Sequence, residues 1–241
     1  MAPPVDHVRM APTGSLPSLR RARSPAAEWG PAGRVAAAVT LLLAAGVPLL
    51  SHVVQPTLPS TDESVAWAAA QPGTAELTKL LDLLALPFLF AGGLVYVLLA
   101  RQRSPRLAYV GGVLLGCGLV GLSAVEGYET LAVTLAGQPR TDLDGLATAL
   151  DQTVGAAAIF MLLLLLGGTL VGTILLAAAL WRSGVIPREI AVLVPLPLLV
   201  DVVVTEGMRA GPHWIPHAVS LVVACLVAGA VVTARSSAVE R

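Results

Sequence analysis

Polar residues divide the chain into six long apolar stretches joined by shorter connections. An α-helix rises about 1.5 Å per residue, so roughly 20 mostly apolar residues cross a bilayer core about 30 Å thick. The stretches have about this length and cover approximately residues 35–54, 80–100, 107–125, 154–180, 190–204 and 215–232. The pattern predicts an all-α membrane protein, a bundle of about six transmembrane helices.

The fifth stretch departs most from this pattern. It is short, and it contains Pro195, Pro197 and Asp201. A proline kink is tolerated inside a bundle, because neighbouring helices and water can bond the carbonyl groups that lose their partners. The sequence therefore predicts a kinked fifth span.

Arginine residues lie on alternate connections, and this asymmetry predicts the orientation. Cytoplasmic loops of membrane proteins carry an excess of Lys and Arg. Arginines precede the first stretch, join the second to the third and the fourth to the fifth, and follow the sixth, at Arg20, Arg21, Arg23, Arg34, Arg101, Arg103, Arg106, Arg182, Arg188, Arg235 and Arg241. The opposite connections hold Lys79, Arg140 and Arg209. We expect both termini in the cytoplasm, an N-in/C-in arrangement.

The ends of the chain differ from its middle. Residues 1–33 are rich in Pro, Ser, Ala and Arg and lack apolar periodicity. Such a segment buries too little surface to offset the entropy lost on ordering. We expect a disordered cytoplasmic tail over residues 1–33, a six-helix transmembrane domain over 34–234, and a short cytoplasmic C-terminus over 235–241.

Two of the outer connections carry signals for helix starts. Residues 61–70 open with Thr61 and Asp62 before an Ala-rich run, and residues 141–151 open with Thr141 three positions ahead of Asp144. The second spacing is that of a capping box. Each connection predicts a short interfacial helix on the outer face. The second helix could also continue into the fourth span as one long helix.

Composition agrees with lipid as the main solvent. The chain is 56% hydrophobic and 12% charged, with a mean hydropathy of +0.80. A formal net charge of zero argues against nucleic acid as a partner, since a phosphate-binding surface needs an excess of Lys and Arg. Cys117 and Cys225 lie inside apolar stretches, and we interpret them as core residues.

Small residues recur at four-residue spacing in two of the stretches. The pairs are Gly112 with Gly116 and Gly168 with Gly172. In lipid this spacing lets two helix backbones approach closely. We interpret both pairs as packing sites within the chain, with an oligomer formed through either pair as the alternative.

Two cytoplasmic turns resemble each other and raise the possibility of a duplicated hairpin. Each bears arginines and closes with Pro-Arg, at residues 101–106 and 182–188, and about twenty residues later the chain reads Glu126-Gly127 or Glu206-Gly207. A tandem repeat would make Glu126 and Glu206 equivalent. Convergence is the alternative, because Pro suits helix starts and Gly suits helix ends.

Ionisable residues within or beside the spans all map to the outer half of the predicted membrane. The candidates for a cavity or ion site are Lys79, Asp82, Glu126, Asp151, Asp201 and Glu206, and the candidate metal ligands are His52, His213 and His217. A carboxylate at such depth is disfavoured unless it is paired, protonated or hydrated, so each should face the bundle interior. We expect the acids to converge on one outward-opening cavity, with Lys79 pairing Asp82 or another acid.

Three explanations of this polar set stay open. The acids could make local structural hydrogen bonds, or they could line a cavity that binds a cation, a proton or a small solute. The third explanation is a zinc or haem site, since His213 and His217 stand four residues apart. Pro212 and Pro216 flank this pair and could place His213 before its helix, so we expect no cofactor.

Motifs of common enzymes are missing from the sequence. It contains no G-x-S-x-G elbow, H-E-x-x-H pair, phosphate-binding glycine loop or C-x-x-C pair. The predicted function is a membrane-embedded binding, transport-related or accessory module with the lipid bilayer and a small solute or cation as partners. The alternative is a metal- or haem-dependent membrane enzyme acting on a lipid or an extracytoplasmic substrate.

One cytoplasmic turn carries a resemblance to known proteins. Leu180-Trp181-Arg182-Ser183-Gly184, closed by Pro187-Arg188, resembles a turn of uncharacterised six-helix membrane proteins of actinobacteria. The resemblance covers one hairpin, and the turn at residues 101–106 departs from it. It implies a multi-pass protein of the bacterial plasma membrane and transfers no catalytic residue.

Overall fold

Five helices in the structure are long and apolar enough to cross a membrane. They are α2 (Pro31–Val54), α4 (Pro72–Ala100), α5 (Pro105–Ala136), a composite helix over Ala156–Ser183, and α11 (Trp214–Thr233). The structure is a computed structural model that describes residues 29–58, 60–139, 141–152, 155–207 and 212–234. Its elements within these ranges are helical, so the predicted all-α fold with apolar helices of membrane-spanning length is confirmed.

The predicted fifth span is not one continuous helix. The segment consists of α9 (Arg188–Leu193), α10 (Leu196–Asp201) and the π-helical turn η2 (Val202–Gly207). Pro195 and Pro197 have no backbone N–H and cannot donate the α-helical hydrogen bonds at their positions. The α-helix is therefore interrupted between α9 and α10. The Val194 N–H bonds the Ala191 carbonyl three residues back, at 3.4 Å, in a tighter turn. Prolines that we expected to kink this helix therefore interrupt it.

The composite fourth helix also contains an irregular turn. It comprises α7 (Ala156–Leu163), the π-helical turn η1 (Leu164–Gly168) and α8 (Thr169–Ser183). The Thr169 hydroxyl donates to the Leu165 carbonyl, and the Thr173 hydroxyl donates to the Thr169 carbonyl at 2.7 Å. These side chains bond carbonyl groups beside the widened turn, which lies next to the cavity described below.

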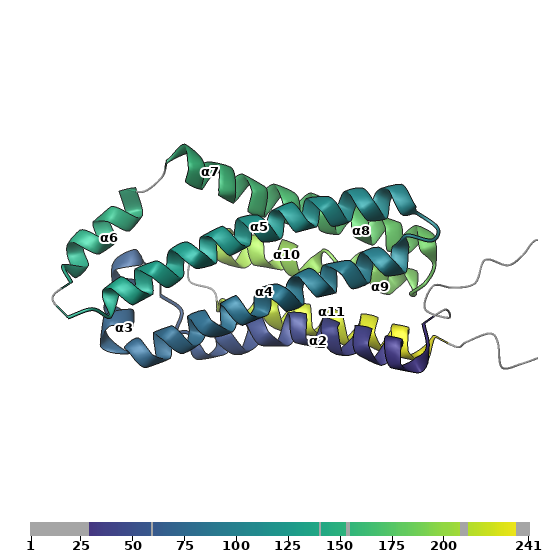
Figure 1. Ribbon diagram of the computed structural model, residues 1–241, viewed down its shortest axis with the longest axis horizontal. Coiled ribbons are helices and arrows are strands. Elements are labelled where there is room, and N and C mark those ends of the chain that lie inside the picture. Colours follow the sequence, from purple (N-terminus) through teal and green to yellow (C-terminus); the bar gives the residue numbers. More distant parts are fainter. Residues whose placement is uncertain (1–28, 59, 140, 153–154, 208–211, 235–241) are drawn as a thin grey trace, which may run out of the picture.

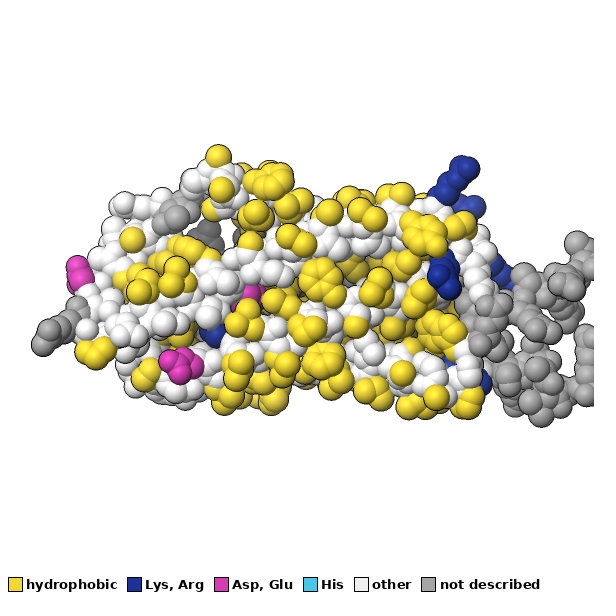
Figure 2. Space-filling model, in the orientation of Figure 1, with side chains coloured by type: hydrophobic (Ala, Val, Ile, Leu, Met, Phe, Trp, Pro, Cys, Tyr) yellow, Lys and Arg dark blue, Asp and Glu magenta, His cyan; other side chains and the backbone are white. Residues whose placement is uncertain are grey.

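The contacts between the helices close into a ring, and Figure 1 shows the long helices running along one another. Around it α11 packs against α2, α2 against α4, α4 against α5, and α5 against α8, while α9 and α10 connect α8 back to α11. A hydrophobic core fills one end of the ring, where Leu99, Leu176, Leu180 and Val227 are fully buried. Large apolar side chains cover the outside of the bundle along its length (Figure 2). This outer surface is the one that lipid would contact.

Both described ends of the chain lie at the same end of the bundle (Figure 1). The Arg34 guanidinium donates to the carbonyl of Ala234, which joins the start of α2 to the end of α11. The arginine-bearing turns before α5 and α9 also lie at this end, where Figure 2 shows Lys and Arg side chains together. The guanidinium of Arg188 lies over the ring of Trp181, with its Cζ atom 5.8 Å from the ring centroid. The charge asymmetry read from the sequence therefore corresponds to one basic end.

Glycines bring α5 and α8 into close contact. A Cβ atom at Gly118 would lie 2.5 Å from the Thr169 backbone nitrogen, and one at Gly172 would lie 2.5 Å from that of Leu115. Gly168 meets the backbone of Gly118 in the same interface. The interpretation of Gly168 and Gly172 as packing sites within the chain is confirmed, and their shared face is not available to a second copy.

The other predicted glycine pair does not act as a unit. A Cβ atom at Gly112 would clash with Val97 of α4, at 2.4 Å, so this residue also packs within the chain. Gly116 has nothing within 4 Å of such an atom and faces open space. Sequence spacing identified small residues but could not say which side of α5 meets a neighbour.

The end opposite the arginines carries two short helices, α3 (Thr61–Ala70) and α6 (Leu143–Gln152) (Figure 1). They pack on the extended ends of α4 and α5 around a second core that includes Val65, Ala75 and Ala147. The Ser60 hydroxyl caps α3 by accepting a hydrogen bond from the Glu63 N–H at 3.2 Å. Both predicted short helices are present at this end, which we call the outer end.

Three local predictions are wrong. The start of the fourth helical region is not continuous with α6, because Gly155 adopts an extended backbone before α7. The Asp142 carboxylate accepts from the Gly145 N–H at the start of α6, whereas the Thr141 hydroxyl bonds the Leu135 carbonyl, so Thr141 and Asp144 form no capping box. Residues 31–33 form the first turn of α2, where proline fits the first helical position.

The remaining prediction at fault concerns the cysteines. Cys117 and Cys225 are both exposed on the outside of the bundle, not buried in its core. In a membrane helix the lipid-facing side is as apolar as the buried side, so an apolar neighbourhood does not identify the core. Residues 1–28 and 235–241 lie outside the described residues, so the predicted disordered cytoplasmic tail and the predicted short cytoplasmic C-terminus stay predictions.

Candidate functional site

A buried lysine bonded to three carboxylates forms the centre of the candidate site. The Lys79 Nζ lies 3.3 Å from the Asp82 Oδ2, 3.4 Å from the Glu126 Oε2 and 2.5 Å from the Glu129 Oε2. The side chains of Lys79 and Asp82 are 8% and 5% exposed, and those of Glu126 and Glu129 are 16% and 48% exposed. We call these four residues the ion cluster. It extends from the interior toward the outer end.

Helix geometry places the ion cluster about one hydrocarbon thickness away from the turn between α4 and α5. About 20 residues, at about 1.5 Å each, span a hydrocarbon core of about 30 Å. Counting this length from the turn between α4 and α5 reaches residue 80 on α4 and residue 125 on α5. Lys79 and Asp82 lie on one face of α4, and Glu126 and Glu129 lie on one face of α5, because a spacing of three returns to the same side of a helix.

A central cavity lies inside the ring, between the ion cluster and the hydrophobic core at the basic end. Its volume is about 370 Å³, within the range of pockets that hold small molecules. All six helical segments contribute to its lining, including the broken one through Val194, Pro197, Leu198 and Asp201. Asp82 and Glu126 of the ion cluster are among the lining residues. The cavity is therefore lined by the whole bundle and has the cluster at its outer end.

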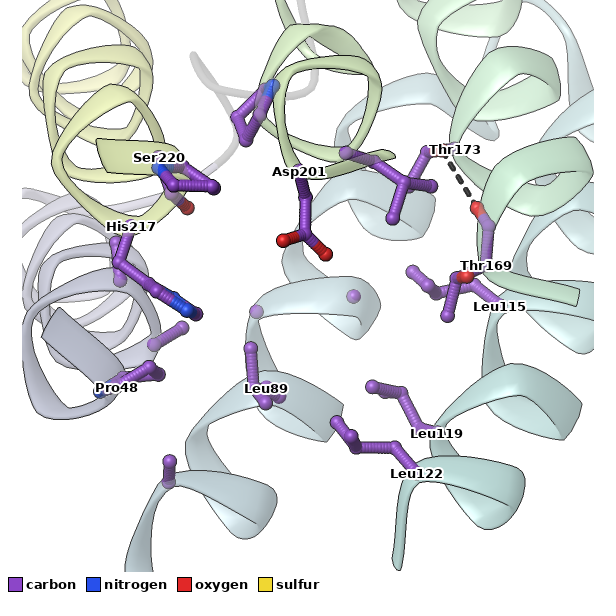
Figure 3. A pocket seen from close by; sticks show the side chains of 18 of the residues that line it. Pro48, Leu89, Leu115, Leu119, Leu122, Thr169, Thr173, Asp201, His217 and Ser220 are labelled. Carbon is purple, nitrogen blue, oxygen red and sulfur yellow. Dashed lines mark hydrogen bonds between the residues drawn. The ribbon is translucent and has the colours of Figure 1, made fainter. Parts of the chain in front are cut away.

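The wall of the central cavity is mostly apolar with a few polar groups. Figure 3 shows the Asp201 carboxylate directed from α10 into the cavity, His217 on α11 to one side, and Thr169 and Thr173 on α8 to the other. Leu89, Leu119 and Leu122 form the part of the wall that faces Asp201 (Figure 3). This arrangement suits a small ligand with an apolar body and a polar or charged group.

Two histidines lie against each other at the edge of the cavity. The ring centroids of His52 and His217 are 3.9 Å apart, with planes tilted by 32°. The His52 Nδ1 is 3.0 Å from the carbonyl oxygen of Pro48. A carbonyl can only accept, so this contact requires the proton on Nδ1. His213, the third candidate ligand, is the residue before the start of α11.

A second cavity lies on the other side of the ion cluster, at the outer end. This outer cavity has a volume of about 490 Å³ and is lined by residues of α3, α5 and α6 together with Lys79 and Glu129. Trp67, Tyr128 and Asp151 are also part of its lining. The Thr61 hydroxyl donates to the Asp151 carboxylate at 2.6 Å and links α3 to α6 across it. The two cavities therefore meet at the ion cluster.

No family model, curated protein or solved structure matches this chain. Among the residues that the structure describes, no group of three His, Cys, Asp or Glu side chains is placed to hold a metal ion. His52 and His217 alone do not form such a group, and His213 does not join them.

The structure distributes the predicted site residues over two cavities. Asp82, Glu126 and Asp201 line the central cavity, and Lys79 contacts the first two. Asp151 lines the outer cavity instead of the central one. The side chain of Glu206 lies outside the described residues. Lys79 contacts Asp82, Glu126 and Glu129, where the prediction gave its partner as Asp82 or another acid.

Sequence reasoning left Glu129 out of the candidate set, although it makes the shortest contact with Lys79. A signal was present, because Glu129 follows Glu126 by three residues and shares its helix face. The polar groups of Thr169, Thr173 and Ser220 were also missed. Hydroxyl residues are common in membrane helices, and nothing in their spacing separates those beside a cavity from those that bond their own backbone.

Proposed function

We propose that this protein binds a small cationic solute in the central cavity, as a binding or transport module of the bacterial plasma membrane. The observation that carries the proposal is a cavity lined by all six helical segments with Asp82, Glu126 and Asp201 in a mostly apolar wall. Carboxylates in a region of low dielectric are stabilised by a nearby positive charge. A cation with an apolar body would satisfy both parts of this wall.

Charge balance supports a positively charged ligand. Three carboxylates of the ion cluster surround the ammonium of Lys79, and Asp201 adds a fourth acid at the central cavity. The described site is thus richer in negative than in positive groups and would attract a cation more strongly than an anion.

The same proposal includes a topology with six crossings and both termini in the cytoplasm. The broken segment from α9 to η2 would be the sixth crossing, since it runs from the basic end beside α8 to the start of α11. Irregular backbone at membrane depth is tolerated when it is buried in protein or lines a cavity, and Pro197 and Asp201 do line the central cavity. The positive-inside rule would place the basic end in the cytoplasm.

Cysteine labelling tests this topology. In a variant without Cys117 and Cys225, a membrane-impermeant maleimide is expected to label Glu63→Cys and Pro212→Cys on intact cells. Glu189→Cys, at the start of α9, should react only after the membrane is opened, because the broken segment separates it from Pro212. Labelling of positions 189 and 212 from the same side would show that this segment does not cross and would overturn the six-crossing topology.

Cation binding tests the function. The protein in a neutral detergent, at constant ionic strength, would be melted with sodium, potassium, tetramethylammonium or butylammonium ions. At least one cation should raise the melting temperature in a saturable way, and Asp201→Asn should weaken its binding by about tenfold or more, as expected when one partner of a buried charge pair is removed. Asp62→Asn, on the exposed surface of α3, is the matched control and should bind as the unmodified protein does.

Either of two results would count against the cation-binding proposal. One is a melting temperature that none of the four cations changes. The other is an Asp201→Asn variant that binds as tightly as the Asp62→Asn control. The alternative of a metal- or haem-dependent enzyme predicts a different result, namely stoichiometric metal or haem in the purified protein, which elemental analysis and absorption spectroscopy would detect.

A further inference from the structure

The two cavities of this protein share the ion cluster as their common wall. Lys79 and Glu129 line the outer cavity, Asp82 and Glu126 line the central cavity, and the Lys79 ammonium contacts all three carboxylates. We infer that the ion cluster is the passage between the cavities and a binding site for a primary ammonium group, at which a ligand exchanges with Lys79. This inference rests on the proposed function and specifies the class of its solute.

The ion cluster already binds a primary ammonium, which is the head group of Lys79. An alkylammonium has three N–H donors and no acceptor, and the cluster presents one carboxylate for each donor. A quaternary ammonium has no donor and could not replace these hydrogen bonds. A ligand that offers the same R–NH₃⁺ group would find contacts of the same kind and length.

The charges of the ion cluster allow a second cation to enter before the first leaves. Three carboxylates face one ammonium, so an added positive charge brings the cluster closer to neutrality. Glu129 is 48% exposed and Asp82 is 5% exposed, so the carboxylates form a series from the outer cavity to the central one. The long flexible stem of lysine lets its ammonium stay with one carboxylate while a ligand takes another.

The cavities on either side fit the remainder of such a ligand. Trp67 and Tyr128 line the outer cavity, where aromatic rings can attract an incoming cation. The central cavity offers the apolar surface of Leu89, Leu119 and Leu122 to the body of the molecule and the carboxylate of Asp201 beyond the cluster. The inferred solute is a primary amine, in its protonated form, with a small apolar body.

Two isomeric cations provide the test, because n-butylammonium and tetramethylammonium share one formula and one charge. In a neutral detergent at constant ionic strength, butylammonium is expected to raise the melting temperature of the full chain in a saturable way. Tetramethylammonium should bind about tenfold more weakly or worse, since it cannot donate a hydrogen bond to a carboxylate. Equal binding of the two isomers would overturn the inference.

Substitutions at the ion cluster complete the test. Glu129→Gln removes the outermost carboxylate and should weaken butylammonium binding by about tenfold. Glu76→Gln, on an exposed position one turn before Lys79 on α4, is the matched control and should leave binding unchanged. Lys79→Arg keeps the positive charge but holds carboxylates in a rigid fork, so it should weaken butylammonium binding in a protein that still melts cooperatively.

The outcomes separate this inference from the proposed function. In one outcome, Asp201→Asn abolishes the binding of a cation, while Glu129→Gln and Lys79→Arg leave that binding unchanged. This result supports the proposed function and overturns the ammonium exchange. Binding of butylammonium that is weakened by Asp201→Asn and by both substitutions at the cluster supports both. If none of the cations binds the unmodified protein, both are overturned.

Discussion

Replacing Lys79 with methionine is expected to destabilise the protein by about 3–5 kcal/mol, the cost of removing one partner from a buried ion pair. Methionine keeps much of the length and volume of the stem but leaves the buried carboxylate of Asp82 and the mostly buried one of Glu126 without their ammonium. The apparent melting temperature in detergent should fall by on the order of 10 °C. Fluorescence-detected melting of the purified protein measures this change.

Two further variants show whether the loss comes from charge. Lys79→Arg retains a cation and should recover most of the melting temperature. Asp82→Asn neutralises the most buried acid of the cluster. It should therefore lower the stability less in the Lys79→Met background than in the unmodified protein, and a double-mutant cycle measures this coupling. A Lys79→Met protein that melts with the unmodified one would show that the carboxylates do not depend on Lys79.

The second large effect is expected at Gly118, where alanine should destabilise the bundle by about 1–3 kcal/mol through overpacking. The added methyl group would lie 2.5 Å from the Thr169 backbone nitrogen and 2.9 Å from the Gly168 carbonyl carbon, and neither backbone atom can move without shifting α8. The helices would have to separate along the interface of α5 and α8. The melting temperature and the yield of monodisperse protein in detergent should both fall.

Gly116 provides a matched control for this substitution. It lies two residues earlier on the same helix, and a Cβ atom there meets nothing within 4 Å. Gly116→Ala should leave the melting temperature unchanged or raise it slightly, because alanine favours helix over glycine by about 1 kcal/mol. Equal effects of the two substitutions would mean that helix propensity, and not the contact between α5 and α8, decides stability here.

Features that repeat along one helix could be predicted from the sequence. Five of the six apolar stretches form membrane-length helices, because a length of roughly 20 apolar residues is a local property that needs no knowledge of neighbours. The pairing of Lys79 with Asp82 follows from their spacing of three residues on α4. The short helix α3 begins at Thr61 as predicted, since its cap at Ser60 is also local.

Features that depend on which side of a helix meets a neighbour could not be predicted from the sequence. Cys117 and Gly116 face outward and Gly118 faces α8, although all three stand within one turn of the same apolar helix. In a soluble protein a polar face would mark the outside. In a membrane helix both faces are apolar, so hydrophobic periodicity gives little information about orientation.

The candidate site also has some features that the sequence determined and others that only the tertiary structure decided. The amino-acid sequence by itself determined that acids and one lysine are gathered toward one end of apolar helices, where their charge forces them away from lipid. Tertiary structure decided that Glu129 joins Lys79 across α4 and α5, that Asp151 belongs to the outer cavity, and that Asp201 reaches the central one from a helix broken at two prolines. Burial cost is a property of each residue alone, whereas the partner that relieves it depends on how the helices pack around the ring.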